Sequence, residues 1–206
     1  MPPVRIKICG LTREDEARAV AGLGADAVGF VFWPRSPRYV APETVGSWIA
    51  DWPAGTLRVG VFVNETPADV ARIMRAARLD VAQLHGREPP EDCAGLPGAV
   101  WKMIPLDGSA AHPPAAYPVD AYLLDRYDPA LPGGSGRTVD WSRAAAFVRA
   151  ADKPVALAGG LRPENIRAAL EQVRPWAVDV SSGVEIAPGR KDMERVKAFI
   201  ELCRAN

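Results

Sequence analysis

Residues 154–183, PVALAGGLRPENIRAALEQVRPWAVDVSSG, contain the pattern that decides the fold. The apolar runs at 154–159 and 177–182 have the composition of strands, and residues 162–173 between them have helical spacing. Both runs are apolar on successive residues, which is typical of parallel strands that are covered on both faces. A strand, a helix and a second strand in this order predict one unit of a parallel α/β fold.

The same alternation extends through the rest of the chain. Six further apolar runs have strand character, at 4–9, 26–32, 57–63, 81–85, 99–104 and 121–125. Five further helices are predicted at 13–24, 41–52, 66–78, 140–151 and 191–203. We expect Thr12 to cap the first of these, and Thr66 to cap the third with Pro67 at its first helical position. Three prolines within 106–118 leave room for at most a turn or two of helix there.

Repeated strand–helix units form either an open doubly wound sheet or a closed barrel. An open sheet that binds a nucleotide usually has a G-x-G-x-x-G turn after its first strand, whereas the turn here is CGLT at residues 9–12. Eight units in 206 residues are close to the minimum for a barrel. We therefore predict one α/β domain over residues 1–206, a (β/α)8 TIM barrel whose helix 5 is short or replaced by a loop.

The composition argues against several classes of function, namely nucleic-acid binding, membrane binding and metal binding. Lys and Arg together number 25, as do Asp and Glu, so no bulk charge favours nucleic acid or an anionic membrane. The sequence has no apolar run of membrane-spanning length and no signal-peptide pattern at its start, so we expect a cytoplasmic protein. We expect a monomer or a homodimer, and the sequence does not decide between them. The three widely spaced cysteines and two histidines fit neither a disulfide framework nor a zinc motif, so we expect no metal.

The predicted strand ends carry the residues of chemical interest, because TIM barrels place their active sites at the carboxyl ends of the strands. The first, fourth and sixth strands end in Cys9, His85 and Asp125. Glycine-rich turns follow the last three strands, and they contain Gly134, Ser135, Gly136, Gly159, Gly160, Ser181, Ser182 and Gly183. One such turn alone is usually an ordinary turn. Together they predict a phosphate site, since small residues let backbone N–H groups approach an anion.

Cys9 has two interpretations. A single cysteine at a strand end is usually a small hydrophobic residue. However, Cys9 shares a strand face with Lys7, and an ammonium group in the barrel interior would favour the thiolate and create a base or nucleophile. A buried Lys7 would itself need a carboxylate, and Asp179 on the adjacent last strand is the expected partner.

Asp125 is also ambiguous when considered alone. An aspartate at the end of a strand often caps a turn, but Asp125 follows the apolar residues 121–124 and can be desolvated enough to keep a proton. It would then serve as a general acid. One acid and one base on either side of a phosphorylated sugar suggest an isomerisation by proton transfer.

Motifs along nearly the whole chain resemble the phosphoribosylanthranilate isomerase family. They are KICGLT, GADAVGFVFWPRSPRYV, VGVFVNE, QLHG, LLD, GGSGRTVDW, LAGGLRPENI and VDVSSGVE followed by PGRKD. The resemblance implies an Amadori rearrangement in tryptophan biosynthesis, from N-(5-phosphoribosyl)anthranilate to 1-(2-carboxyphenylamino)-1-deoxyribulose 5-phosphate, without a cofactor. It further implies that Cys9 is the general base and Asp125 the general acid.

The resemblance also assigns binding roles. Arg38 matches the arginine that faces the anthranilate carboxylate, a task that suits the planar guanidinium group. The backbone around 134–136, 159–160 and 181–183 matches the phosphate contacts of the family. His85 would line the opening of the barrel, although a structural role is equally consistent with the sequence.

Two other classes stay open from the residues alone. Another phosphosugar barrel enzyme is one, either the histidine-pathway isomerase, which would use paired aspartates, or indoleglycerol-phosphate synthase, which would use lysine acids. Lys102 lies inside a predicted strand but has no obvious partner in the sequence. The other class is a non-catalytic phosphosugar-binding barrel, which would have no need for Cys9 and Asp125 together.

Overall fold

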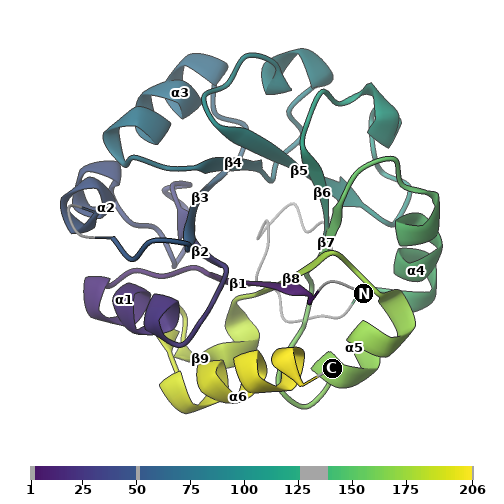
Figure 1. Ribbon diagram of the computed structural model, residues 1–206. Helices are drawn as coiled ribbons and strands as arrows, with labels where there is room; N and C mark the ends of the chain where they lie inside the picture. The colour runs from purple at the N-terminus through teal and green to yellow at the C-terminus, as the bar shows by residue number, and fades with distance from the viewer. Residues whose placement is uncertain (1–2, 50–51, 126–138, 206) are drawn as a thin grey trace.

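The computed structural model describes residues 3–49, 52–125 and 139–205. Eight parallel strands form a closed barrel, each paired with its neighbours in chain order (Figure 1). The strands are β1 Arg5–Cys9, β2 Ala27–Val31, β3 Leu57–Phe62, β4 Val81–Leu84, β5 Ala99–Pro105, β6 Ala121–Asp125, β7 Val155–Leu157 and β8 Ala177–Val180. Strand β8 closes the barrel against β1, with Lys7 opposite Asp179. The predicted TIM-barrel fold is confirmed.

Helices surround the barrel on its outside (Figure 1). They are α1 Glu14–Gly22, α2 Pro42–Trp48, α3 Pro67–Ala76, α4 Trp141–Ala150, α5 Ile166–Val173 and α6 Met193–Arg204. Short 3-10 turns follow β4 and β5, namely η1 Pro90–Cys93 and η2 Pro114–Ala116. The turn η2 is the expected replacement for helix 5, and η1 is a second replacement that the sequence analysis did not identify. None of the helices in the described ranges has the length and hydropathy needed to cross a membrane.

The two predicted helix caps have different outcomes. Thr66 caps α3 as expected, because its side chain accepts a hydrogen bond from the Asp69 N–H. Thr12 does not cap α1, which begins after Arg13 without a side-chain cap. The Thr12 hydroxyl instead donates to the Gly189 carbonyl at 2.7 Å. A tertiary partner therefore overrides the local capping pattern.

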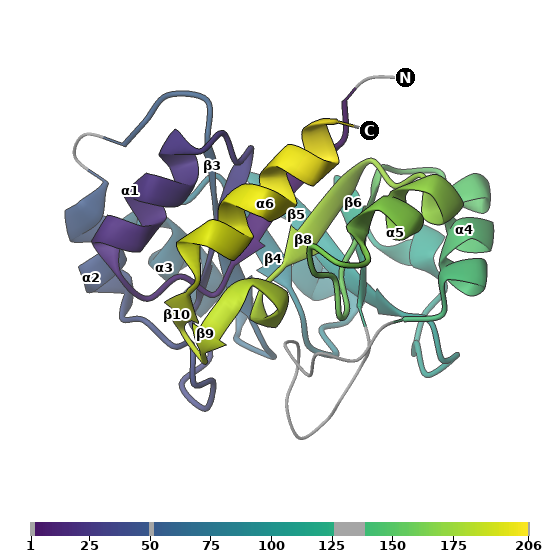
Figure 2. The same cartoon turned by 90° about the horizontal axis from the view of Figure 1, so that it is seen from below.

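A small hairpin lies between β8 and α6. After the 3-10 turn η3 Ser182–Val184, strands β9 Glu185–Ala187 and β10 Arg190–Lys191 pair in antiparallel fashion. Seen from the side, the hairpin lies below the lower end of α6, near the ends of the strands where β1 and β8 leave the barrel (Figure 2). The hairpin is therefore close to the loops that follow the strands.

Side chains alternate between the inside and the outside of the barrel, and this alternation creates two kinds of core. Outward-facing residues such as Ile6, Ile8 and Phe30 pack against the helices in the main hydrophobic cluster. Inside the barrel, Trp101 and its neighbours fill the space near the amino ends of the strands. Near the carboxyl ends, polar side chains such as Lys7, Gln83 and Asp179 are buried in the interior beside apolar ones, and we call this end of the barrel the mouth.

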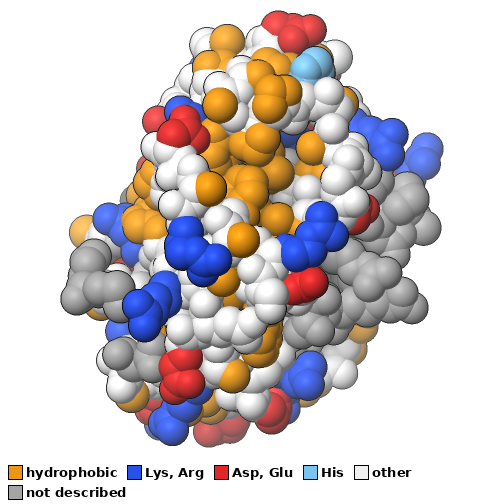
Figure 3. Space-filling view, turned by 90° about the vertical axis from the view of Figure 1, so that its right-hand side faces the viewer, with side chains coloured by type: hydrophobic (Ala, Val, Ile, Leu, Met, Phe, Trp, Pro, Cys, Tyr) orange, Lys and Arg blue, Asp and Glu red, His pale blue; other side chains and the backbone are white. Residues whose placement is uncertain are grey.

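One outer face carries hydrophobic side chains that are only partly buried (Figure 3). Figure 3 shows hydrophobic side chains gathered between charged ones on the face that carries α4 and the 106–120 segment. Leu106, Phe147 and Val148 of these segments are only partly buried against the main core. The turn η2 replaces a barrel helix on this face, and the central residues of β5 are nevertheless buried.

Candidate active site

The predicted strand-end residues meet in one cavity at the mouth. The cavity opens to solvent, and the space between its atoms, open solvent included, is about 690 Å³. Its polar or glycine lining consists of Cys9, Ser36, Arg38, Gln83, His85, Asp125, Gly159, Gly160, Asp179, Ser181 and Ser182. Gly183 lines an adjacent hollow. Gly134, Ser135 and Gly136 lie outside the described residues.

The expected ion pair beneath the cavity is present. Lys7 Nζ donates to Asp179 Oδ2 at 2.8 Å, and both side chains are buried. Burial alone would lower the pKa of Lys7, but the charges of Asp179 and Cys9 outweigh burial and raise it. Lys7 therefore carries its positive charge inside the barrel.

Lys7 favours the Cys9 thiolate as expected, because its charge lowers the pKa of Cys9, but it is not the largest influence on that pKa. Burial is the largest effect on Cys9 and raises its pKa above the ordinary value of 9.0, while Lys7 lowers it. Asp179 opposes Lys7 because its negative charge also raises the pKa of Cys9. Burial outweighs the ammonium group, so Cys9 is predominantly a neutral thiol near pH 7.

Gly29 on β2 leaves the space that Cys9 occupies. A Cβ atom at Gly29 would lie 2.7 Å from Cys9 Sγ, which is closer than real contacts allow, and 3.1 Å from Lys7 Cε, which is a tight contact. Gly29 was not among the site residues predicted from the sequence. A glycine inside a strand was the available signal, because it often marks a close approach of another group.

Asp125 and His85 contact each other across the cavity. His85 Nε2 lies 3.4 Å from Asp125 Oδ2, and both side chains are buried. The other ring nitrogen of His85, Nδ1, is 3.0 Å from Gln83 Nε2. His85 is thus beside the proposed acid, and Gln83 fixes its ring. Gln83 was missed in the sequence, where the signal was a polar residue inside an apolar strand.

Lys102 has a partner, contrary to its interpretation from the sequence. Its Nζ donates to Glu88 Oε2 and to the Gly86 carbonyl, both at 2.9 Å. Glu88 in turn accepts hydrogen bonds from the backbone N–H groups of Gly86 and Asn64. Lys102 faces outward from the barrel and is absent from the cavity lining, so it holds the turn after β4 rather than taking part in the chemistry of the mouth.

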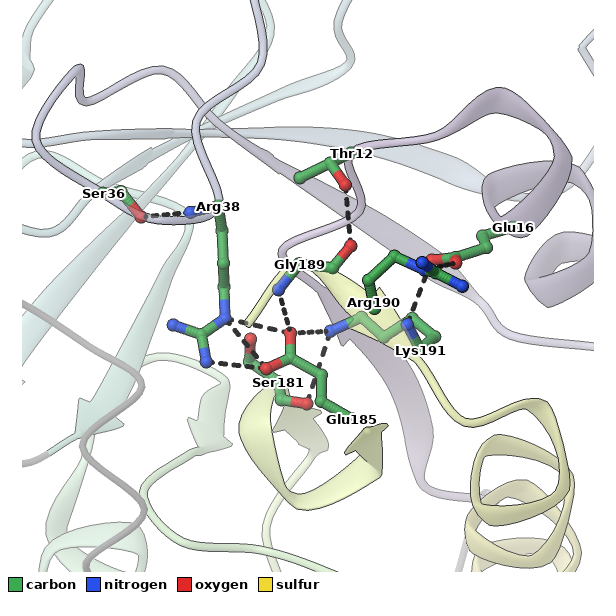
Figure 4. A network of polar contacts seen from close by, with 9 residues as sticks. All are labelled: Thr12, Glu16, Ser36, Arg38, Ser181, Glu185, Gly189, Arg190 and Lys191. Carbon is green, nitrogen blue, oxygen red and sulfur yellow. Dashed lines mark hydrogen bonds and ion pairs between the residues drawn. The ribbon is translucent and has the colours of Figure 1, made fainter. Parts of the chain in front are cut away.

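Arg38 reaches the cavity from the loop after β2. It is buried, and its guanidinium group donates to the carboxylate of Glu185, with Nη2 2.7 Å from Oε2 (Figure 4). Gly10, at a φ of +77°, lets the chain pass close to this side chain, since a Cβ there would lie 2.5 Å from Arg38 Cδ. Glu185 was missed in the sequence, where nothing linked it to Arg38.

The turns after β7 and β8 lie against each other. Gly159 and Gly160 have φ values of +79° and +65°, which only glycine adopts readily. A Cβ at Gly183 would collide with the Leu161 carbonyl of the neighbouring turn. Among the described residues, the buried Ser181 Oγ has no hydrogen-bond partner. The two turns therefore present backbone groups and a hydroxyl at one place, as anion binding requires.

A metal centre has no support in this geometry. Across the described ranges, no group of three or more His, Cys, Asp or Glu side chains is placed to bind a metal ion. The mouth instead combines a thiol, a carboxyl group and an imidazole with donors for anions. This combination suits proton transfer on an anionic substrate.

Comparison with known proteins identifies close relatives. Residues 6–202 match the family model for N-(5'-phosphoribosyl)anthranilate isomerase. The curated enzyme of that name from Geobacter sulfurreducens is 50% identical over 96% of this chain and 97% of its own length. The crystal structure of phosphoribosyl anthranilate isomerase from Thermus thermophilus has a TM-score of 0.89 at 41% identity, covering 98% of this chain and 99% of that chain.

A further similar structure contains a ligand. It is a phosphoribosyl anthranilate isomerase in complex with reduced 1-(o-carboxyphenylamino)-1-deoxyribulose 5-phosphate. It is 36% identical, with a TM-score of 0.82, and the match covers 98% of this chain and 100% of that chain.

Proposed function

The chain belongs to the N-(5'-phosphoribosyl)anthranilate isomerase family, and from this we propose that Cys9 is the general base and Asp125 the general acid of the reaction at the mouth. The enzyme is an isomerase of tryptophan biosynthesis that converts an aminoaldose phosphate to an aminoketose phosphate. The observation that carries the assignment of residues is the single cavity lined by Cys9, Asp125 and the glycine turns.

The first step opens the sugar ring. Asp125 donates a proton to the furanose ring oxygen, the bond from that oxygen to C1′ breaks, and the nitrogen electron pair forms a Schiff base with C1′. Asp125 must be protonated for this step. Asp125 is buried at the mouth beside His85 and lines the cavity, so its carboxyl group can reach a substrate bound there.

The second step moves a proton from carbon. Cys9 removes the proton from C2′, and the electron pair forms the enolamine double bond between C1′ and C2′. The C2′ hydroxyl then loses a proton while C1′ gains one, which gives the ketone. Two protons are gained and two are lost, so the product is an isomer of the substrate and no oxidant or cofactor is consumed.

The thiol of Cys9 must first release its own proton to solvent through the open cavity, because only the thiolate can accept the C2′ proton. The Lys7 ammonium group stabilises the thiolate when it forms, and Asp179 holds Lys7 in place. Because burial raises the pKa of Cys9, the thiolate is scarce but strongly basic. Lys7 and Asp179 therefore support the base without touching the reacting carbon.

Two anionic ends of the substrate need recognition. The turns at 159–160 and 181–183 are suited to the phosphate, and the resemblance adds 134–136 as a prediction. Arg38 would receive the anthranilate carboxylate, and His85 would border the ring beside Asp125. Cytoplasmic location and a monomeric or homodimeric state remain predictions.

The reaction is tested by loss of anthranilate-type fluorescence when the pure protein meets freshly made phosphoribosylanthranilate, with EDTA present. Cys9→Ser and Asp125→Asn should each lose at least roughly 10²-fold in kcat. Cys203→Ser, which changes a cysteine in α6, is the control and should retain activity. Full activity of either Cys9→Ser or Asp125→Asn would remove that residue from the proposed acid–base pair.

A further inference from the structure

Three buried charges lie at the edge of the cavity, and the proposed function uses one of them. Arg38 comes from the loop after β2, Glu185 from β9 and Lys191 from β10 (Figure 4). Their side chains are 8%, 4% and 0% exposed. Buried charges are unfavourable unless they are paired, so this cluster needs an explanation beyond a surface ion pair.

Glu185 occupies one edge of the Arg38 guanidinium group. Nε lies 2.9 Å from Oε1 and Nη2 lies 2.7 Å from Oε2, which is a bidentate arrangement. The other terminal nitrogen points away from Glu185 in Figure 4, and no described residue forms a hydrogen bond with it. A second carboxylate can therefore bind the guanidinium group on its free edge.

Lys191 adds the charge that keeps this edge attractive to an anion. Its Nζ donates to Glu185 Oε1 at 2.7 Å and to the Ser181 carbonyl at 3.3 Å. Arg38 and Glu185 alone would sum to zero charge, whereas a protonated Lys191 gives the three groups one positive charge. Burial lowers the pKa of Lys191, and the charge of Glu185 and its hydrogen bond oppose that effect. Burial would raise the pKa of Glu185, but Arg38 and Lys191 outweigh burial and lower it. Glu185 therefore stays ionised.

The support for Glu185 does not depend on Arg38. Its hairpin is attached to the start of α1 by the Thr12 hydroxyl, which donates to the Gly189 carbonyl, and by the Lys191 backbone N–H, which donates to Glu16 Oε2 at 3.1 Å. The Gly189 N–H also donates to Glu185 Oε1 at 3.3 Å (Figure 4). Contacts within the hairpin and between the hairpin and α1 therefore fix the position of Glu185, and Glu185 in turn fixes the position of Arg38.

We propose that Glu185 is a positioning residue that aims the free edge of Arg38 at the aromatic carboxylate of the substrate, with Lys191 balancing its charge. This inference rests on the proposed function, because that function assigns the carboxylate to Arg38. Glu185 thereby favours substrates whose aromatic ring carries a carboxylate. It contributes to specificity without touching the reacting atoms.

The test compares two stable ligands by calorimetry. One is reduced 1-(o-carboxyphenylamino)-1-deoxyribulose 5-phosphate, and the other is the same compound without its ring carboxylate. For Glu185→Gln we expect the Kd of the first ligand to rise roughly 10-fold or more, since a hydrogen bond to a charged group is being misaligned. The Kd of the second ligand should change less than about threefold, because this ligand has no carboxylate to bind Arg38 and independent sites have nearly additive effects.

Two measurements accompany the titrations. Turnover of phosphoribosylanthranilate by the wild type tests the proposed function separately, and the kcat of Glu185→Gln should change far less than its KM. Glu164→Gln is the matched control, because Glu164 accepts a hydrogen bond from Arg195 at the surface and is half exposed. It should bind both ligands like the wild type.

The outcomes separate the two ideas. Equal loss of affinity for both ligands would make Glu185 merely structural and overturn the inference. Tighter binding of the carboxylate ligand by Glu185→Gln would also overturn it, by showing that Glu185 competes with the substrate for Arg38. A wild type that neither turns over the substrate nor binds either ligand would remove the proposed function and this inference with it.

Discussion

Lys7 Nζ lies 2.8 Å from Asp179 Oδ2, across the line where β8 pairs with β1 and closes the barrel. The pair therefore joins the two strands that close the barrel and also lies directly beneath the candidate active site. Lys7 is also one of the charges that lower the pKa of Cys9. A single substitution here should consequently change stability and the reactivity of Cys9 together.

Replacing Lys7 with Met should unfold the protein more easily. The change leaves the Asp179 carboxylate buried and unpaired, and breaking a buried ion pair from one side typically destabilises by about 3–5 kcal/mol. Urea unfolding followed by circular dichroism measures the loss. The double variant Lys7→Met/Asp179→Asn should regain a large part of the stability, and a double variant as unstable as the single one would contradict this account.

The reactivity of Cys9 toward iodoacetamide should increase steeply with pH. Only the thiolate reacts, and the pKa of Cys9 is raised above 9.0, so the thiolate fraction keeps rising up to and beyond that pH. Between pH 7 and 9 the rate should rise about tenfold per unit, as expected below the pKa of a single group. Mass spectrometry locates the modified cysteine, and a plateau below pH 8 would show that Lys7 outweighs burial.

The barrel and the Lys7–Asp179 pair could be predicted because both follow from simple periodicity. Alternating apolar runs and helices give the strand order, and the alternation of side chains along β1 puts Lys7 and Cys9 on one face. Asp179 then becomes the partner because the last strand of a closed barrel neighbours the first. Both steps depend on the regular geometry of strands and barrels, which repeats along the sequence and can therefore be predicted from it.

Other features depend on contacts that no pattern encodes. Glu185 contacts Arg38 across 147 residues of sequence because of a hairpin that no sequence pattern predicted. Lys102 in β5 contacts Glu88 because the turn after β4 folds over this strand. The pKa of Cys9 depends on how completely it is buried, which the sequence analysis could not measure. Thr12 fits a capping pattern, yet Gly189 lies within reach of its hydroxyl.

Gly29→Ala should lower activity without unfolding the barrel. The added methyl group would lie 2.7 Å from Cys9 Sγ, so the thiol must move, and a displacement near 1 Å can reduce catalysis by roughly 10²-fold. The measurement is kcat by the fluorescence assay, with thermal unfolding as the check on folding. Gly22→Ala in α1 is the matched control, because a Cβ there meets nothing within 4 Å. If Gly29→Ala has the same kcat as the wild type, the exact position of Cys9 is not critical for catalysis.

Lys102→Met should damage stability rather than chemistry. Lys102 and Glu88 are both buried and lie 2.9 Å apart, so removing the ammonium group leaves Glu88 unpaired and should destabilise by about 3–5 kcal/mol. The double variant Lys102→Met/Glu88→Gln removes both charges and should recover much of that loss in urea unfolding. Its kcat should stay within about tenfold of the wild type, because a general acid or base would contribute 10²-fold or more. A stable double variant that has lost roughly 10³-fold in kcat would instead make Lys102 part of the catalytic machinery, in spite of its position outside the cavity.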